Sequence, residues 1–181
     1  MLRRILFILT VPFAAVITFA APALAAVAPG AYTPTPGSFN PANAPGSSHL
    51  TSGSPSCTVN ADRSIDCSAY VLGGVGHTNA TVDLAASYSA IIDCTNHGGN
   101  LVESHTSNFS ADSTATVASN RNGQLRVSAQ SVSPFSAPQV CPNPNWTPSI
   151  RGGTVTLNSF TYTLTFAGFS SPYITITATD P

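Results

Sequence analysis

The chain has 181 residues, of which 7% are charged, and its formal net charge at pH 7 is −1. All six basic residues are arginines, and they are too few and too scattered to form a basic stripe. No surface of this chain could follow a phosphate backbone or an anionic bilayer, so nucleic acid and membrane surfaces are excluded as partners of the mature protein.

Residues 1–25 have the pattern of a secretory signal peptide. Two arginines precede an apolar run over residues 5–21, and residues 23–25 (Ala-Leu-Ala) supply the small side chains of a cleavage site. The alternative is an uncleaved membrane anchor, but Pro12 and Pro22 interrupt the run and favour cleavage. We therefore expect a secreted protein, either free outside the cell or associated with the cell envelope.

Residues 26–56 differ in composition from the rest of the mature chain. They contain six prolines together with many glycines, serines and alanines. A stretch of this kind buries too little apolar surface to offset its ordering entropy, and its prolines favour extended conformations. We expect a solvated spacer over residues 26–56, followed by a folded domain over residues 57–181.

The four cysteines all follow the predicted cleavage site, which indicates two disulfides in an oxidising environment. Cys57 and Cys67 bracket a turn-forming stretch over residues 60–63, so a hairpin would place them opposite each other. Cys94 and Cys141 are then the second pair. A thiolate metal site is not expected because the chain has no C-x-x-C motif.

Apolar and polar residues alternate strictly over residues 80–94, which predicts a half-buried strand. Further candidate strands are residues 65–71, 102–109, 114–118, 125–129, 154–158, 160–166 and 173–178. About eight short strands without a convincing helix predict an all-β fold, specifically a single antiparallel immunoglobulin-like β-sandwich. A barrel is less favoured, because the proline-rich residues 134–148 suit a crossover between two sheets.

The most constrained loop of the sequence carries the only tryptophan of the chain. Trp146 follows Asn143 and Asn145, and the loop contains three prolines within residues 141–148. Trp146, Asn143 and Asn145 are candidate ligand-binding residues, with the indole as a stacking platform and the amides as hydrogen-bonding groups. The favoured alternative makes Trp146 a plug over one end of the core, near the predicted Cys94–Cys141 bridge.

No catalytic motif is present. The nucleophile motif G-x-S-x-G is missing. The candidate carboxylate pair of a glycoside hydrolase would have to come from Asp83, Asp93 and Glu103, but the first two are ten residues apart on one strand. Residues 60–66 place oxygen-bearing side chains at alternate positions as a calcium loop does, but Ile65 replaces the required glycine.

A zinc site at Glu103, His105 and His97 is a further alternative to ordinary polar side chains. We predict no metal and no cofactor.

Two segments carry a resemblance to known proteins. Residues 94–100 (Cys-Thr-Asn-His-Gly-Gly-Asn) and 141–147 (Cys-Pro-Asn-Pro-Asn-Trp-Thr) resemble paired segments of small secreted all-β proteins of actinobacterial type, a group of unknown function. In composition the chain is also similar to neocarzinostatin-like chromophore carriers. These resemblances imply an exported, two-disulfide β-sandwich and leave its activity open.

The sequence therefore predicts an exported, non-enzymatic binding or surface module whose partner is a cell-wall glycan or an extracellular protein. Two alternatives stay open: a small-ligand carrier with a groove between its sheets, and a secreted hydrolase whose catalytic residues are unrecognised.

Overall fold

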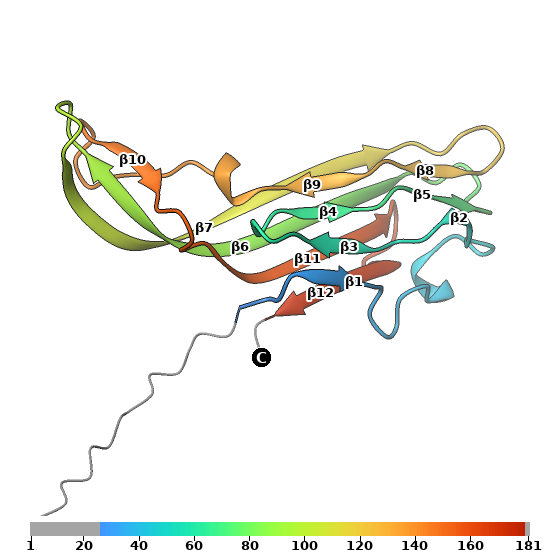
Figure 1. The fold of residues 1–181 in the computed structure, drawn as a ribbon. Coiled ribbons are helices and arrows are strands. Elements are labelled where there is room, and N and C mark those ends of the chain that lie inside the picture. Colours follow the sequence, from blue (N-terminus) through green and yellow to red (C-terminus); the bar gives the residue numbers. More distant parts are fainter. Residues whose placement is uncertain (1–25, 180–181) are drawn as a thin grey trace, which may run out of the picture.

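The computed structural model describes residues 26–179, so the predicted signal peptide lies outside the described residues (Figure 1). The described part is all-β and holds twelve strands in three antiparallel sheets, with two short 3₁₀ helices. In chain order the elements are β1 (Gly30–Tyr32), η1 (Pro41–Asn43), β2 (His49–Gly53), β3 (Cys57–Val59), β4 (Ile65–Cys67), β5 (Tyr70–Gly73), β6 (Ala80–Thr95), β7 (Leu101–Val117), β8 (Leu125–Val127), β9 (Gln130–Val132), η2 (Pro134–Ser136), β10 (Thr147–Ile150), β11 (Thr156–Phe166) and β12 (Ile174–Thr179).

The largest sheet is built around β6, the strand predicted from the alternation over residues 80–94. Its even-numbered residues are buried and its odd-numbered residues face outward, so that prediction is confirmed. β7 pairs along the whole of β6 on one side, while β11 and β10 share the other side and β12 pairs with β11. We call these five strands the back sheet.

A second layer, the front layer, covers one face of the back sheet and consists of two small sheets placed end to end (Figure 1). One sheet has the order β1-β3-β4-β9 and the other β2-β5-β8. Three lines of chain run through both: β2 leads into β3, β4 into β5, and β8 into β9. The strand pairing of each line is interrupted for two or three residues at the same position along the strand direction. These interruptions divide the front layer into its two sheets.

Local chemistry explains this interruption. Pro55 has no backbone N–H to donate to a neighbouring strand. Ser68 bridges the gap instead, because its hydroxyl donates to the carbonyl of Ser54 at 2.6 Å and accepts from the N–H of Ser56 at 3.0 Å. Gly53 has φ +75° there, and a Cβ on it would lie 2.8 Å from the carbonyl oxygen of Ala69. Together with the bond from the Ser68 N–H to the carbonyl of Ser56 at 2.8 Å, these contacts join two of the three lines across the break.

The strand count exceeds the expected eight mainly because β1, β2, β3, β9 and β10 form in stretches outside the candidate strands. The interruption of the front layer also splits residues 65–71 into β4 and β5, because a two-residue break leaves no mark in the hydrophobic pattern. In the opposite direction, the separately predicted residues 102–109 and 114–118 belong to the single strand β7.

The prediction of a solvated spacer over residues 26–56 is wrong, because this segment is part of the fold. Val27 is buried, and its N–H donates to the carbonyl of Leu157 at 2.9 Å. The ring of Tyr32 packs edge-on against Phe160, with 5.3 Å between the ring centroids. A few apolar anchors of this kind hold a segment whose composition alone predicts solvation, and its prolines lower the entropy lost on ordering.

The N-terminal segment also protects the free edge of β12. The hydroxyl of Ser38 donates to the carbonyl of Thr175 and accepts from its N–H, both at 3.1 Å. The N–H of Thr35 donates to the same carbonyl at 2.8 Å. An exposed strand edge is a template for pairing with another chain, so this contact removes an aggregation hazard.

Large apolar and aromatic side chains fill the space between the two layers. Tyr70 of the front layer and Tyr162 of the back sheet are both buried, and their hydroxyls lie 2.9 Å apart. Phe160, Phe166 and Leu84 are also fully buried in this core.

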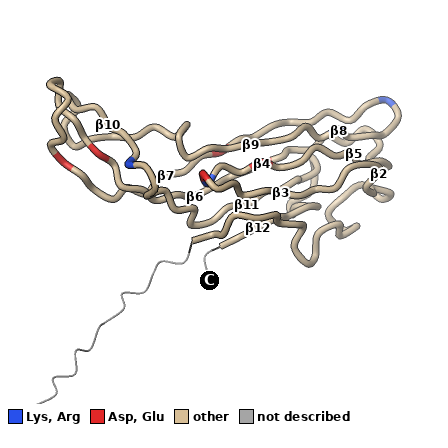
Figure 2. The backbone as a smooth tube through the Cα atoms, viewed as in Figure 1, with Lys and Arg blue, Asp and Glu red and all other residues tan. Residues whose placement is uncertain are grey.

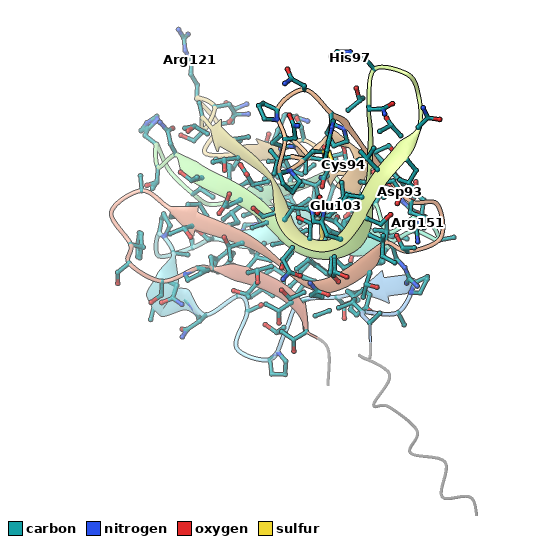
Figure 3. The ribbon with its side chains drawn as sticks, turned by 90° about the vertical axis from the view of Figure 1, so that its left-hand side faces the viewer. Asp93, Cys94, His97, Glu103, Arg121 and Arg151 are labelled. Atoms are coloured by element: carbon teal, nitrogen blue, oxygen red, sulfur yellow. A yellow bond between two sulfur atoms is a disulfide. The ribbon has the colours of Figure 1, made fainter. Side chains whose placement is uncertain are left out.

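Both predicted disulfides are present. Cys57 and Cys67 are direct cross-strand partners, and Cys94 is bonded to Cys141. The second bridge lies where the β6–β7 hairpin extends beyond the front layer and curves into a U, the distal end of the molecule (Figure 3). Two disulfides are typical of proteins in an oxidising environment.

Candidate functional site

The Trp146 loop lies at the distal end, where it packs on the hairpin. The indole is half-buried against a small cluster formed by Ala90, Ile92 and Cys94. This position is close to the plug that the sequence favours, although the side chain keeps part of its surface in solvent.

The two asparagines of this loop differ in their use. The Asn143 side chain accepts from the N–H of Asn145 at 2.9 Å, and its backbone carbonyl accepts from the N–H of Trp146 at 3.0 Å. Asn143 therefore shapes the turn, while the side chain of Asn145 is exposed. The structure brings the three candidate binding residues together, but one amide is already occupied within the loop.

The strand-borne acids lie apart and have local partners. Asp93 forms a two-point ion pair with Arg151, with N–O distances of 2.6 and 3.0 Å, on the outside of the hairpin (Figure 3). Its hydrogen bonds to Arg151 and Ser104 hold the pKa of Asp93 below its ordinary value of 3.8. Glu103 lies 3.7 Å from His105. The Asp93–Arg151 pair pins the β10–β11 connection to β6.

The two metal hypotheses find no support in the geometry. Across residues 26–179, no group of three or more His, Cys, Asp or Glu side chains is arranged to hold a metal ion. In the calcium-like turn, the Asn60 amide nitrogen donates to Ser64 at 2.9 Å and to Asp66 at 2.6 Å. That amide presents a donor where a cation would require oxygen ligands.

A groove that the sequence did not indicate lies beside the tip of the β3–β4 hairpin. Two adjoining hollows of about 490 and 280 Å³ share Asp62 and run between the hairpin tip and η2. Their walls, which together define the η2 groove, are Ala61, Asp62, Arg63, Ser64, Asp66, Asp112, Ser131, Val132, Ser133, Phe135, Ser136, Gly153 and Val155. Most of these side chains are polar, and they come from several segments that are distant in sequence.

The aromatic wall of the groove is Phe135. Its side chain is 60% exposed, which makes it the one strongly exposed aromatic residue in the described part of the chain. The neighbours of Phe135 explain this position. Ser133 caps η2 by accepting from the Phe135 N–H at 3.3 Å, while Pro134 and Ala137 are buried and anchor the helix on both sides. A ring held outward by buried neighbours presents its face to solvent at little entropic cost on binding.

The hairpin-tip wall is held in a fixed conformation. Arg63 has φ +70°, a left-handed conformation that is uncommon for a residue other than glycine. Its guanidinium donates to the carbonyl of Val27 at 3.2 Å, and its own carbonyl accepts from the Tyr88 hydroxyl at 3.2 Å. Burial raises the pKa of Tyr88 to about 12, so this hydroxyl stays a donor in mildly alkaline solution as well as at neutral pH. Strained backbone that surrounding contacts hold in place is typical of binding and catalytic sites.

The groove is acidic, and much of its hydrogen-bonding capacity is free. The hydroxyl and N–H of Ser64 donate to Asp62 at 2.6 and 3.0 Å, which lowers the pKa of Asp62 below 3.8 and keeps it ionised. Within residues 26–179, the carboxylate of Asp112 has no hydrogen-bond partner of its own. Figure 2 shows acidic residues near the hairpin tip and in the distal half, each with a basic residue close by, and a further basic residue at the opposite end of the molecule.

Sequence reasoning missed this groove because its residues carry no shared motif. The hairpin-tip acids were assigned to turn formation, and Phe135 lies in a proline-flanked stretch that resembles any crossover loop. The one available signal was the Pro-Phe-Ser sequence, since an apolar side chain between turn-forming residues is often exposed.

Compared with family models, with curated proteins and with solved structures, the chain matches none of them. No helix within residues 26–179 is long and apolar enough to span a membrane.

Proposed function

We propose that the protein is an exported, non-enzymatic carbohydrate-binding module and that the η2 groove is its binding site. The observation that carries the proposal is the combination, in one groove, of an exposed aromatic ring with free carboxylate and hydroxyl groups. The partner is a cell-wall glycan, one of the two partners that the sequence analysis expected, and residues 26–179 fold as an immunoglobulin-like sandwich.

The chemistry of the groove suits a sugar. A pyranose ring has one apolar face, which stacks on an aromatic side chain such as Phe135. Its neighbouring hydroxyls donate to carboxylate oxygens, for which Asp112 and the second oxygen of Asp66 are available, while the hydroxyl of Ser131 both donates and accepts. The carboxylates repel anionic polymers, so the groove favours an uncharged glycan.

The context of the chain supports an extracellular role. The signal-peptide pattern and two disulfides agree with export, and a surface rich in serine and threonine stays soluble with few charges. The carrier alternative has less support, because large side chains such as Phe160 and Tyr162 occupy the space between the layers. An extracellular protein remains the alternative partner for the same groove.

Binding to insoluble polysaccharides tests the proposal. The purified mature chain is incubated with peptidoglycan, chitin or cellulose, and the dissociation constant is obtained from the depletion of protein from solution. Phe135→Ala removes the stacking face and should weaken binding about tenfold or more, as the loss of a central aromatic anchor does. Asp112→Asn keeps the shape of the side chain and should weaken binding by a smaller factor.

Two controls of matched chemistry lie outside the groove. Val140→Ala removes another strongly exposed apolar side chain, which is 72% exposed, and Glu103→Gln removes another partly exposed carboxylate. Both should bind like the wild type. If Phe135→Ala binds normally while Trp146→Ala does not, the site is the Trp146 loop. Absence of binding to every polysaccharide would refute the carbohydrate proposal and favour a protein partner.

A further inference from the structure

A second hollow lined by hydroxyls lies on the outer face of the back sheet, beside the turn over residues 167–169. Its volume is about 430 Å³, and its polar walls are Thr81, Asp83, Thr114, Thr163 and Thr165. These five residues, which we call the threonine hollow, form one cross-strand patch. Asp83 is paired with Thr114 on one side and Thr163 on the other, and Thr81 is paired with Thr165.

The threonine hollow has hydrogen-bonding groups in reserve. One carboxylate oxygen of Asp83 accepts from the hydroxyl of Thr114 at 2.5 Å. Within the described residues, the other oxygen of Asp83 and the hydroxyls of Thr163 and Thr165 have no hydrogen-bond partner. The patch therefore offers one charged acceptor surrounded by hydroxyls, the same polar groups that line the η2 groove.

The edge strand β7 connects this hollow to the η2 groove. Asp112 of the groove and Thr114 of the hollow are two residues apart on β7 and both are exposed, so they share one face about 7 Å apart. At the same edge, Ser113 of β7 is hydrogen-bonded to Gln130 of β9 at 2.5 Å. The outer surfaces of the two layers are thus joined where β7 and β9 meet.

On the front layer the polar surface continues from β9 to β4. Ser131 and Asp66 are direct cross-strand partners, and both are exposed. A continuous polar path therefore leads from the hairpin tip over β9 and β7 to the threonine hollow. Its three hydrogen-bonded strand intervals alone, β4–β9, β7–β6 and β6–β11, span roughly 15 Å, which is longer than a single sugar ring.

We propose that the η2 groove and the threonine hollow are the two ends of one binding track for a linear, uncharged polysaccharide chain. This inference rests on the proposed function and adds the form of the ligand: several consecutive sugar units, instead of a mono- or disaccharide. Phe135 anchors one end of the chain by stacking, and Asp83 accepts hydrogen bonds from the hydroxyls of units at the other end.

Chain-length dependence tests the track. Calorimetric titration of the mature protein with N-acetylglucosamine oligomers of two, four and six units should show an affinity that rises about tenfold or more with length, as added subsites engage. Asp83→Asn and Thr163→Val should lower the affinity for the hexamer about fivefold to tenfold, because a charged acceptor or a hydroxyl is lost. Neither variant should change the affinity for the dimer by more than about twofold.

Thr177→Val is the matched control, since it removes an outward hydroxyl of the same sheet that does not line the hollow. The track would be overturned if the wild type bound dimer and hexamer with equal affinity and Asp83→Asn bound like the wild type. If Phe135→Ala still weakened binding in that case, the η2 groove would stand as the binding site. If the wild type binds no oligomer of any length and none of the three insoluble polysaccharides, the proposed function fails together with the track. If Thr177→Val weakens hexamer binding as strongly as Thr163→Val, the assignment of the track to the threonine hollow is also wrong.

Discussion

At the scale of single residues, the Tyr70–Tyr162 pair is the clearest link between the two layers. Among residues 26–179, each of the two hydroxyls has the other as its one hydrogen-bond partner, and both lie in a largely apolar core. Replacing either tyrosine by phenylalanine leaves a buried hydroxyl without a partner, which should lower the free energy of unfolding by about 1–3 kcal/mol. The double variant should lose less than the sum of the two single variants, as measured by urea denaturation.

Purely additive losses in this cycle would show that the two hydroxyls do not depend on each other. The circular dichroism spectrum of each folded variant serves as the control for an unchanged fold.

The same pair predicts how stability changes at alkaline pH. Burial raises the pKa of Tyr70 and of Tyr162 above the ordinary value of 10.0, so both stay protonated in the folded chain. The unfolded chain releases these protons above about pH 10, and the free energy of unfolding therefore falls as the pH rises beyond that value. The Tyr70→Phe/Tyr162→Phe variant should lose less stability between about pH 9 and pH 11. An identical pH dependence would contradict the assigned burial.

Trp146 offers a second test at this scale. Because the indole is half-buried on the Ala90–Ile92–Cys94 cluster, Trp146→Ala should lower the free energy of unfolding by about 1–3 kcal/mol, less than truncation of a fully buried tryptophan. Its fluorescence should be quenched by acrylamide to an intermediate degree, between the unfolded chain and a buried indole. Quenching equal to that of the unfolded chain would show that the loop does not pack on the hairpin.

At the scale of elements, the N-terminal segment is the part whose role changed most between sequence and structure. Deleting residues 26–48 removes buried Val27 and Ala44 and the cap on β12, so the thermal midpoint should fall by about 10 °C or more. A milder variant, Ser38→Ala, should lower the midpoint by a few degrees and increase aggregation, because the β12 edge loses two hydrogen bonds.

Ser170→Ala is the control for the milder variant, because Ser170 is exposed in the loop before β12. A deletion variant that melts within a few degrees of the wild type would restore the picture of a solvated spacer.

The elements that the sequence predicts best are those with a long, regular period. Strict alternation located β6, and cysteine spacing around a turn located the Cys57–Cys67 hairpin. The breaks in the front layer escaped prediction because they depend on Ser68 bonding to residues on another strand. The η2 groove escaped for a similar reason: Asp62, Asp112 and Phe135 are far apart in sequence and become neighbours only through β-sheet pairing.

At the scale of the whole molecule, one end is stabilised by a disulfide and the middle carries the polar path. The Cys94–Cys141 bridge and the Asp93–Arg151 pair hold the distal end. The tip of the β3–β4 hairpin, one wall of the η2 groove, lies near the middle of the long axis (Figure 1). A rigid frame around a preformed groove keeps the entropic cost of binding low.

The most direct test of this account is to map where a glycan binds on the folded protein. We expect that titrating ¹⁵N-labelled protein with the N-acetylglucosamine hexamer will shift the amide signals of residues 61–66, 112–114 and 131–136. The signals of residues 143–147 should stay in place. Shifts confined to residues 143–147 would contradict the assignment of the binding site to the η2 groove.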